Sequence, residues 1–437
     1  MSKYKPIEGL NIRDDTYLLK LIKEEVKKMP FIREPTRNLI RKLRNVDLHL
    51  QTEPLIELWK CLVGDAIIFL KLKDNREKYH DQMTLGTENL FEFLKEFQDF
   101  EPILYGAVPN YRDHIAHVFR VFLLGQNVID SAIGFERVGP CQKNLPVSRE
   151  EKEAIWCISA LTHDLGYSLE VIHHINQSVR SMLQQFGNIP VQELGYSYFS
   201  QFGSVSEFAV RFLSSDVVEI KKDQFATHLQ AKYYQKFLSA LSSFNHGVIS
   251  SIILMKDLVY FKESDYMVDQ FKPLEKEDAR QFLIRKEILR AIASHSCDDI
   301  YYLGIKNFPF LLKACDEMQE WGRPRLVDVT KRGGSRTELT INRFDGKMLD
   351  YKVTFSFPNG YKPSEAERTN TEIEVKEYFS KKCNRWLNVL RSAVGGHQRD
   401  LELRFTVEDK TTYEVKTYTL HHKNPSEIEI RPSGLVT

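Results

Sequence analysis

The sequence is poor in cysteine: it has six in 437 residues, and no two of them form a CxxC pair. The six are Cys61, Cys141, Cys157, Cys297, Cys315 and Cys383. Scattered thiols, several of them in apolar helical context, suit buried free cysteines in a reducing compartment better than a disulfide framework. We therefore expect no disulfide scaffold.

A long apolar run is also missing. The most apolar stretch, residues 61–72, is interrupted by Asp65 and Lys71, and no window approaches the roughly 20 apolar residues of a membrane span. The first residues lack the apolar segment of a signal peptide. These absences predict a cytoplasmic protein without a membrane partner.

No excess of charge of one sign is present, because the net charge is +1. The chain therefore has no overall electrostatic footprint for nucleic acid or an anionic membrane, although a local basic cleft stays possible. Nucleic acid is not indicated as a partner. The length of 437 residues instead favours a globular protein of two or three domains.

The first two regions of the chain carry helical patterns. Within residues 1–100, Leu18, Leu19, Ile22 and Val26 recur close to the helical period, which predicts an N-terminal helical lobe packing on the next region. Residues 101–325 continue with long helical patterns. They contain an insertion at 165–244, whose Gly/Tyr/Ser-rich centre at 195–200 is typical of a substrate-facing loop.

The pattern of apolar and polar residues changes after residue 325. Segments 349–357, 401–407 and 413–417 alternate with period two, and Val375, Phe379, Cys383 and Trp386 mark one helical face between them. Residues 326–437 are therefore expected to form a small α+β domain, plausibly β-β-α-β-β, with the helix on one face of the sheet. It has no cluster of candidate ligands, so its role stays open. The fold class predicted for the whole chain is mainly α.

The most informative motif is Leu-Thr-His-Asp-Leu-Gly-Tyr at residues 161–167. Ser148 is a suitable N-cap for the preceding helix, which then ends on His163 and Asp164, with Gly166 as a stop signal. Imidazole and carboxylate are both ligands for divalent cations, and a carboxylate can bridge two of them. The motif predicts a metal site if other ligands converge on it.

Further candidate ligands lie at the ends of other helical patterns. They are His117, His246, His295 and Asp316. With 13 histidines in the chain, any one of them is more often an ordinary polar residue than a ligand. The order of the whole set carries the hypothesis.

The order His, His-Asp, His, His, Asp across roughly residues 100–325 resembles the HD-domain superfamily of metal-dependent phosphohydrolases, in its six-ligand, two-metal form. The resemblance implies an all-helical HD core. It also implies that His117, His163, Asp164 and Asp316 surround one metal, with Asp164 bridging to a second metal held by His246 and His295.

Such a ligand set suits two divalent transition-metal ions (Fe, Mn, Ni or Zn) and argues against a structural, cysteine-rich zinc site. Two cations about 3.5–4 Å apart can share a water, lower its pKa and neutralise a phosphoryl group that the resulting hydroxide attacks. The expected function is that of a phosphomonoesterase or phosphodiesterase acting on a nucleotide or another small phosphorylated metabolite.

Several further residues are candidates for the chemistry of the same site. Many two-metal HD phosphodiesterases have a lysine where this chain has Tyr167, and no Gly-Tyr-Pro signature follows, which puts cleavage of cyclic dinucleotides in doubt. A phenol can still donate a hydrogen bond to a leaving oxygen, so Tyr167 joins Asp164 and His114 as a catalytic candidate. Candidate phosphate ligands are Arg112, Arg120, Arg323 and Arg325, since guanidinium forks suit phosphate oxygens. A structural ion pair or a solvated position is the alternative for each arginine.

Two other classes of function stay open. Six-ligand members of the same superfamily include oxygenases with a mixed-valence di-iron centre, and a metal-binding regulatory or sensor protein is the third possibility. One of His173 and His174 can turn towards the site, and Cys297 and Cys315 near the ligands are expected to be buried, inert thiols. A homo-oligomer is possible.

Overall fold

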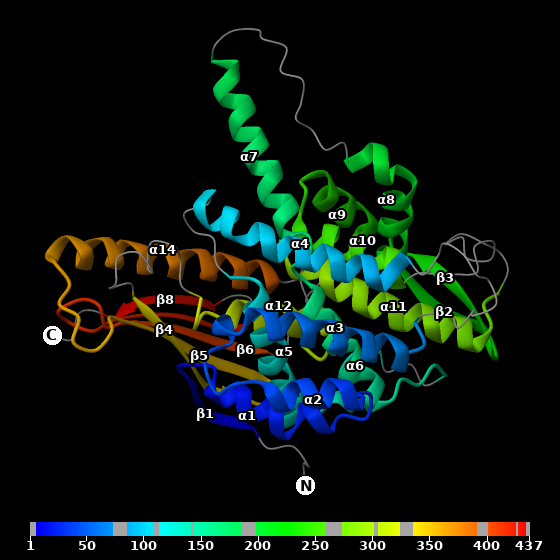
Figure 1. The fold of residues 1–437 in the computed structure, drawn as a ribbon, viewed down its shortest axis with the longest axis horizontal. Helices are drawn as coiled ribbons and strands as arrows, with labels where there is room; N and C mark the ends of the chain where they lie inside the picture. The colour runs from blue at the N-terminus through cyan, green and yellow to red at the C-terminus, as the bar shows by residue number, and fades with distance from the viewer. Residues whose placement is uncertain are drawn as a thin grey trace.

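A computed structural model describes residues 6–72, 85–107, 113–140, 144–185, 198–258, 273–300, 305–323, 335–390, 401–424 and 427–433. The described part is mainly helical and carries a sheet built largely from its C-terminal third (Figure 1). Among these residues no single helix is long and apolar enough to span a membrane. The segments Ala231–Ser242 and His246–Met255 pass the same test together, by length and composition only, with a bend of 101° between them.

The helical body contains twelve of the labelled helices. They are α1 (Thr16–Glu24), α2 (Glu34–Lys42), α3 (Thr52–Phe69), α4 (Leu85–Ala107), α5 (Ile115–Val128), α6 (Arg149–Thr162), α7 (Tyr167–Gln184), α8 (Tyr198–Ser214), α9 (Ala231–Ser242), α10 (His246–Leu258), α11 (Lys276–His295) and α12 (Phe308–Met318). Short helical turns occur at Val26–Lys28, Leu48–Leu50, Ile129–Ile133 and Phe135–Arg137.

Helices α5, α6, α11 and α12 form the centre of this body. Helix α5 packs against α3, α6 and α12, and α11 packs against α6, α10 and α12. Nearly every side chain of α5 and α6 is buried, so these helices are enclosed on all sides and their polar side chains lie in the interior. The centre of the body is therefore rigidly packed on every side, and polar groups at its helix ends are held in fixed positions.

The start and end of α6 agree with the sequence expectation. The Ser148 hydroxyl accepts a hydrogen bond from the Glu151 backbone N–H, and the Glu151 side chain accepts one from the Ser148 N–H. This reciprocal capping box satisfies two backbone donors that the helix leaves unpaired. The helix then ends at Thr162, directly before His163 and Asp164.

The larger sheet has six strands in the order β1-β4-β5-β6-β7-β8. Their bounds are β1 (Ile7–Ile12), β4 (Arg336–Phe344), β5 (Met348–Ser356), β6 (Glu402–Asp409), β7 (Lys416–Asn424) and β8 (Glu427–Ser433). Only β5 and β6 are parallel, and such a pair requires a crossover connection. Helix α14 (Glu365–Val389) lies in that connection and covers one face of the sheet (Figure 1). The Trp386 indole N–H of α14 donates to the Tyr351 hydroxyl of β5 at 2.6 Å.

The predicted β-β-α-β-β order is therefore present, with two additional strands. β8 extends one edge, and β1 from the N-terminus pairs with β4 at the other. The expectation of a wholly helical N-terminal region is wrong at residues 7–12. The strand expected at 413–417 begins only at Lys416, because Tyr413 and Val415 lie exposed in the preceding connection.

The helical body also contains a hairpin that the sequence did not predict. β2 (Ser215–Lys221) and β3 (Gln224–Leu229) pair within the insertion, so the expectation of an all-helical core is wrong there. Residues 195–197 of the expected substrate-facing loop lie outside the described residues, and the remaining three begin α8.

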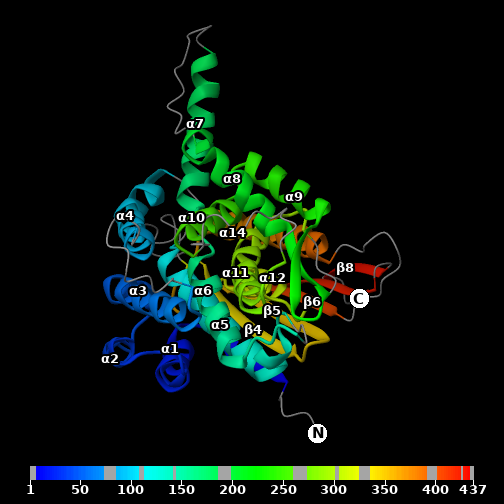
Figure 2. The same cartoon turned by 90° about the vertical axis from the view of Figure 1, so that its right-hand side faces the viewer.

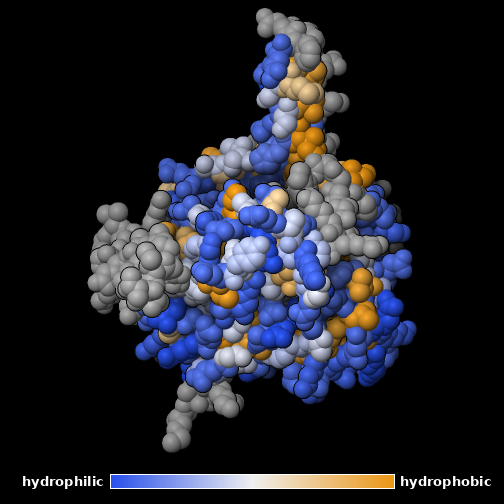
Figure 3. Space-filling view, turned by 90° about the vertical axis from the view of Figure 1, so that its left-hand side faces the viewer, coloured by the Kyte–Doolittle hydropathy of each residue, from blue (hydrophilic) through white to orange (hydrophobic). Residues whose placement is uncertain are grey.

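Helix α7 projects from the body in both views (Figures 1 and 2). Apolar side chains follow one side of the projecting arm in the space-filling view, and Ile175 and Met182 are exposed on it (Figure 3). The base of α7 carries Tyr167 and Glu170, both beside the predicted metal ligands. The arm is therefore anchored at the candidate site.

Candidate metal centre

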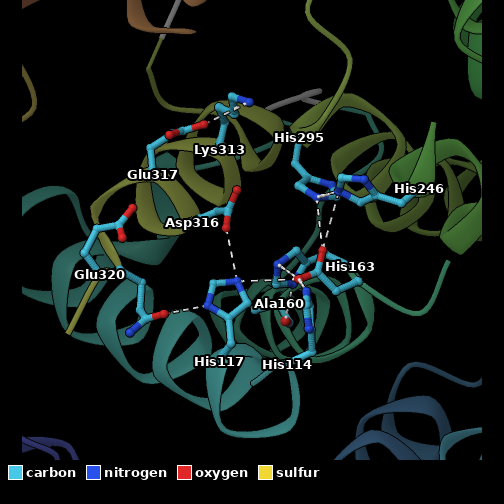
Figure 4. A network of polar contacts seen from close by, with 12 residues as sticks. His114, His117, Ala160, His163, His246, His295, Lys313, Asp316, Glu317 and Glu320 are labelled. Atoms are coloured by element: carbon cyan, nitrogen blue, oxygen red, sulfur yellow. Dashed lines mark hydrogen bonds and ion pairs between the residues drawn. The ribbon is translucent and has the colours of Figure 1, made fainter. Parts of the chain in front are cut away.

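The predicted ligands converge at helix ends inside the body (Figure 4). His163 and Asp164 directly follow α6, His246 is the first residue of α10 and His295 is the last residue of α11. Of the remaining two, His117 lies in the first turn of α5 and Asp316 lies near the end of α12. Five helices that are distant in sequence thus bring their ends to one point.

Asp164 lies between two pairs of imidazoles. Its Oδ2 atom is 3.5 Å from Nε2 of His117 and 3.5 Å from Nε2 of His163. Its Oδ1 atom is 3.6 Å from Nε2 of His246 and 3.5 Å from Nε2 of His295. In each group of three the potential ligand atoms lie within 4.8 Å of one another, so each can hold a metal ion. The shared carboxylate belongs to both groups.

Asp316 approaches the first of these groups through His117. Its Oδ1 atom is 3.1 Å from Nε2 of His117. Burial disfavours ionisation of Asp316, but His117, His163 and His295 outweigh it and hold its pKa well below the ordinary value. The same balance between burial and the surrounding imidazoles holds the pKa of Asp164 well below its ordinary value. Both carboxyls are therefore anionic at neutral pH, as metal ligands must be.

In all four imidazoles the Nδ1 atom contacts an oxygen, while Nε2 faces Asp164. The contacts join His117 to the Gln319 side-chain oxygen at 2.6 Å, His163 to the Ala160 carbonyl at 2.8 Å, His246 to a Glu170 carboxylate oxygen at 2.6 Å and His295 to the Ile292 carbonyl at 2.6 Å. An oxygen acceptor at Nδ1 fixes the neutral tautomer that carries its proton there. The Nε2 lone pair is then directed to the centre, which is the usual arrangement of metal-ligating histidines.

Two local contacts are unfavourable without a cation. Within the described part of the chain, Nε2 of His163 is buried and makes no hydrogen bond, which costs free energy in a protein interior. Nε2 of His246 and Nε2 of His295 lie 3.1 Å apart while both Nδ1 atoms contact oxygens, so a proton or a metal ion must lie between their lone pairs. Burial acts to lower the pKa of His246, but Glu170 outweighs it and the pKa lies above its ordinary value. Burial, the largest cause, lowers the pKa of His163 and so favours its neutral, metal-binding form. Imidazole nitrogens and carboxylate oxygens grouped in this way could hold a metal ion.

A cavity of about 280 Å³ opens onto this centre. Its lining comprises His114, His117, Asp164, Tyr167, His246, Asp316, Glu320, Arg323, Tyr378, Lys381, Lys382 and Arg385. The last four belong to α14, so the C-terminal α+β unit forms one wall of the cavity. No pattern in the sequence indicates this contribution, because the unit carries no ligand motif of its own.

The predicted catalytic residues His114 and Tyr167 both line the cavity. Their ring centroids are 4.1 Å apart, and Nε2 of His114 lies 3.9 Å from Oδ2 of Asp164. Burial holds the pKa of His114 well below its ordinary value, so the residue is neutral at pH 7. A neutral imidazole can donate a hydrogen bond, but it does not supply the proton of an imidazolium.

Of the four predicted phosphate-binding arginines, one lines the cavity, one is buried in an ion pair and two lie outside the described residues. Arg323 lines the cavity. Arg120 is fully buried, and its Nε and Nη2 atoms donate to Asp15 at 2.8 and 2.7 Å, so its guanidinium is occupied in a structural ion pair instead of facing the cavity. Arg112 and Arg325 lie outside the described residues.

The other histidines and cysteines near the ligands do not join the site. His173 stacks on Phe244 with ring centroids 4.0 Å apart, and neither it nor His174 lines the cavity. Cys297 and Cys315 are free and buried, as expected. Burial raises the pKa of Cys297 to about 11 and that of Cys315 further, so both are thiols at neutral pH.

Two residues that orient the ligands were not predicted. Gln319 follows Asp316 by three residues and Glu170 follows Tyr167 by three, so each shares a helical face or turn with a predicted site residue. Polar residues at this spacing are the signal that could have identified them. The Gln319 amide also donates to the Trp321 carbonyl at 2.7 Å, which fixes the orientation of the oxygen that His117 contacts.

A buried ionic network joins α12 to α14 directly beside the ligand Asp316. Glu317 contacts Nζ of Lys382 at 2.6 Å, Nζ of Lys313 at 3.2 Å and Nη1 of Arg385 at 3.3 Å. Burial alone would raise the pKa of Glu317, but these three cations lower it to about 2. Because Lys382 also contacts Glu320 at 2.8 Å, the network holds α14 against the metal centre.

Comparison with protein-family models gives no match for this chain, and comparisons with curated proteins and with solved structures give none either. The cluster of His117, His163, Asp164, His246 and His295 that can bind metal therefore rests on its own geometry.

Proposed function

We propose that the chain is a dinuclear-metal phosphohydrolase of the HD type, a phosphomonoesterase or phosphodiesterase that acts on a small phosphorylated metabolite such as a nucleotide. One observation carries the proposal: each carboxylate oxygen of Asp164 faces its own pair of histidine Nε2 atoms. A carboxylate placed in this way is suited to bridge two cations.

The candidate ligands fall into two groups, one for each metal position. His117, His163, Asp164 and Asp316 would hold one cation, and Asp164, His246 and His295 would hold the other. When bound, the pair supplies Lewis acidity, which lowers the pKa of a water and neutralises charge on phosphoryl oxygens. Iron, manganese, nickel and zinc all suit this donor set.

The protein itself supplies orientation and hydrogen bonds. Gln319 and Glu170 hold His117 and His246 in the tautomer that directs Nε2 to the centre. Tyr167 lines the cavity beside neutral His114, from where its phenol can donate a hydrogen bond to the leaving oxygen of a substrate. Arg323 on the same cavity provides a guanidinium for a phosphate oxygen.

The charge of the cavity supports a phosphorylated substrate. Beyond the ligands, its wall carries Arg323, Lys381, Lys382 and Arg385, with Glu320 as the acidic member. A cationic wall beside two metals attracts an anion and stabilises charge that develops on it. We therefore favour phosphate ester hydrolysis over the oxygenase and sensor alternatives.

The first prediction tests the function directly. Protein purified without chelator is expected to contain about two transition-metal equivalents per chain and to release phosphate or cleave a phosphodiester in a substrate panel. Asp164→Asn keeps the side-chain shape but removes the bridging charge, and His163→Gln removes one ligand. Both variants are expected to lose metal and at least about 100-fold in activity.

Metal content by elemental analysis and product release under anaerobic conditions are the measurements. His228→Ala is the matched control, because His228 lies exposed on β3 and does not line the cavity. The proposal would be refuted if elemental analysis found almost no metal in protein purified without any chelator. Turnover that stops without oxygen, which is the behaviour of an oxygenase, would also refute it.

A further inference from the structure

The cavity has two chemically different halves. The metal-ligand half is formed by α5, α10, α12 and the loop after α6, and the other half by α14 and the residues that follow α12. The second half holds four cationic residues, Arg323, Lys381, Lys382 and Arg385. Whether they bind a ligand depends on which of their charges the protein already balances.

Lys382 is balanced within the protein. Its ammonium contacts Glu317 at 2.6 Å and Glu320 at 2.8 Å, and Lys313 contacts Glu317 from the other side at 3.2 Å. These two lysines and two glutamates carry no net charge as a group. Lys382 therefore positions α14 and is not available to a substrate.

The other three cations are not balanced in this way. Arg385 directs only Nη1 to Glu317, at 3.3 and 3.4 Å, and its side chain is 54% exposed. Lys381 is exposed and forms no ion pair within the described part of the chain. Nε of Arg323 is buried and has no hydrogen-bond partner among the residues that the structure describes. An unpaired buried guanidinium nitrogen costs free energy unless an acceptor reaches it.

The unbalanced cations lie close to the metal ligands. Arg323, Lys381 and Arg385 line the same cavity as the candidate ligands His117 and Asp316. Nη1 of Arg385 lies 3.3 Å from Glu317, the residue directly after Asp316, and Lys381 precedes Arg385 by one turn of α14. A ligand that reaches the metals therefore also reaches these side chains.

Charge balance indicates what that ligand carries. Two divalent cations on the anionic ligands would already neutralise the phosphoryl group under attack. Arg323, Lys381 and Arg385 add three positive charges that a single phosphate does not need. Guanidinium and ammonium groups grouped in this manner suit a further phosphate.

We infer that Arg323, Lys381 and Arg385 bind a second phosphoryl group, so that the substrates are compounds with at least two phosphates, such as nucleoside di- or triphosphates. This inference rests on the proposed function for the first phosphate and adds the subsite for the second. The cavity of about 280 Å³ lies at the small end of the range for ligand pockets. It suits a short chain of phosphates better than a folded polynucleotide.

Calorimetric titration of the full-length protein, as purified, tests the subsite with two probes. The probes are imidodiphosphate, which resists hydrolysis, and orthophosphate. Imidodiphosphate is expected to bind at least about tenfold more tightly, and Lys381→Ala and Arg323→Gln are each expected to weaken its binding about tenfold through loss of a charge-assisted hydrogen bond. Orthophosphate binding is expected to change less than twofold, roughly, in Lys381→Ala.

Lys376→Ala is the matched control on the same helix, because Lys376 pairs with Glu372 and does not line the cavity. Imidodiphosphate binding that is unchanged in both cavity variants would overturn the inference. A second outcome separates the two ideas. If imidodiphosphate binding weakens in the cavity variants but the protein hydrolyses no phosphate ester, the proposed function is refuted and the subsite is retained. The opposite outcome is also distinguishable. If hydrolysis depends on Asp164 but Lys381→Ala keeps the preference for nucleoside triphosphate over monophosphate, the function is retained and the subsite is overturned.

Discussion

At the scale of single residues, the candidate centre depends on control of the imidazole tautomers. Each of the four histidines around Asp164 has an oxygen at Nδ1, two from backbone carbonyls and two from the side chains of Gln319 and Glu170. The two carbonyls come from the turn of helix that carries the histidine, so that contact is local. Gln319 and Glu170 are the partners that a substitution can remove.

Glu170→Gln is expected to weaken metal binding at the His246 and His295 group by about 10–100-fold, as losses of partners to ligating histidines typically do. The neutral amide cannot match the carboxylate acceptor 2.6 Å from Nδ1 of His246. Competition with a chromophoric chelator measures the affinity. Glu207→Gln, at an exposed ion pair with Arg211 on α8, is the control. Equal metal affinity in both variants would contradict a role for Glu170 at the centre.

At the scale of elements, the ligands are placed by where helices begin and end. The capping box fixes the start of α6, and its 14 residues then determine where His163 and Asp164 emerge. These features are local, so the sequence predicted them. The approach of α6 to α5 is not local. Gly125 of α5 lies directly against the buried Trp156 of α6, whose indole N–H donates to the Phe122 carbonyl at 3.0 Å.

Gly125→Ala is expected to lower the free energy of unfolding by about 1–3 kcal/mol, the usual cost of overpacking. A Cβ at this position would lie 1.9 Å from Cζ2 of Trp156, so the helices must separate. Gly64→Ala in α3 is the matched substitution, because no atom of the described residues lies within 4 Å of the Cβ that alanine would add. It is expected to stabilise the protein by up to about 1 kcal/mol through helix propensity. Urea unfolding curves that rank the two variants in the reverse order would contradict this packing.

At the scale of the whole molecule, contacts between distant segments join the helical body, the N-terminus and the C-terminal sheet. β1 pairs with β4 across more than three hundred residues of sequence, and α14 forms a wall of the cavity. Asp15 is a junction of the same kind. It accepts hydrogen bonds from Arg120 of α5, from the Trp321 indole at 3.1 Å and from the Leu48 backbone at 2.8 Å.

Asp15→Asn is expected to lower the free energy of unfolding by about 3–5 kcal/mol, because it leaves the buried Arg120 without its counter-ion. Burial acts to raise the pKa of Asp15, but Arg120 and the other donors lower it below its ordinary value of 3.8. The stabilisation is therefore full above about pH 4 and is lost as the pH falls below that value. The variant is expected to lack this part of the acid dependence.

Urea unfolding at neutral pH and at pH 3 measures both effects. Arg13→Ala breaks the exposed ion pair between Arg13 and Glu338 and serves as the control, with an expected change of about 1 kcal/mol or less. Equal losses in the two variants at neutral pH would contradict the role of Asp15 as a buried junction.

Features that depend on neighbouring residues could be predicted from the sequence. Helical and alternating patterns indicated the helices around the site and the β-β-α-β-β order. The sequence also supplied the candidate ligands, since His163 and Asp164 end a capped helix and His246 and His295 stand at helix ends. The assignment of these ligands to two positions came from a resemblance.

The way in which the segments share one site follows from long-range contacts in the folded chain. The pairing of β1 with β4, the burial of Arg120 against Asp15 and the placement of Lys381 and Arg385 on the cavity leave no pattern in the local sequence. These contacts depend on which apolar faces meet when the chain folds, a property of the whole molecule rather than of any short segment. For this reason the sequence predicted the metal ligands, and the structure was needed to find the cationic wall opposite them.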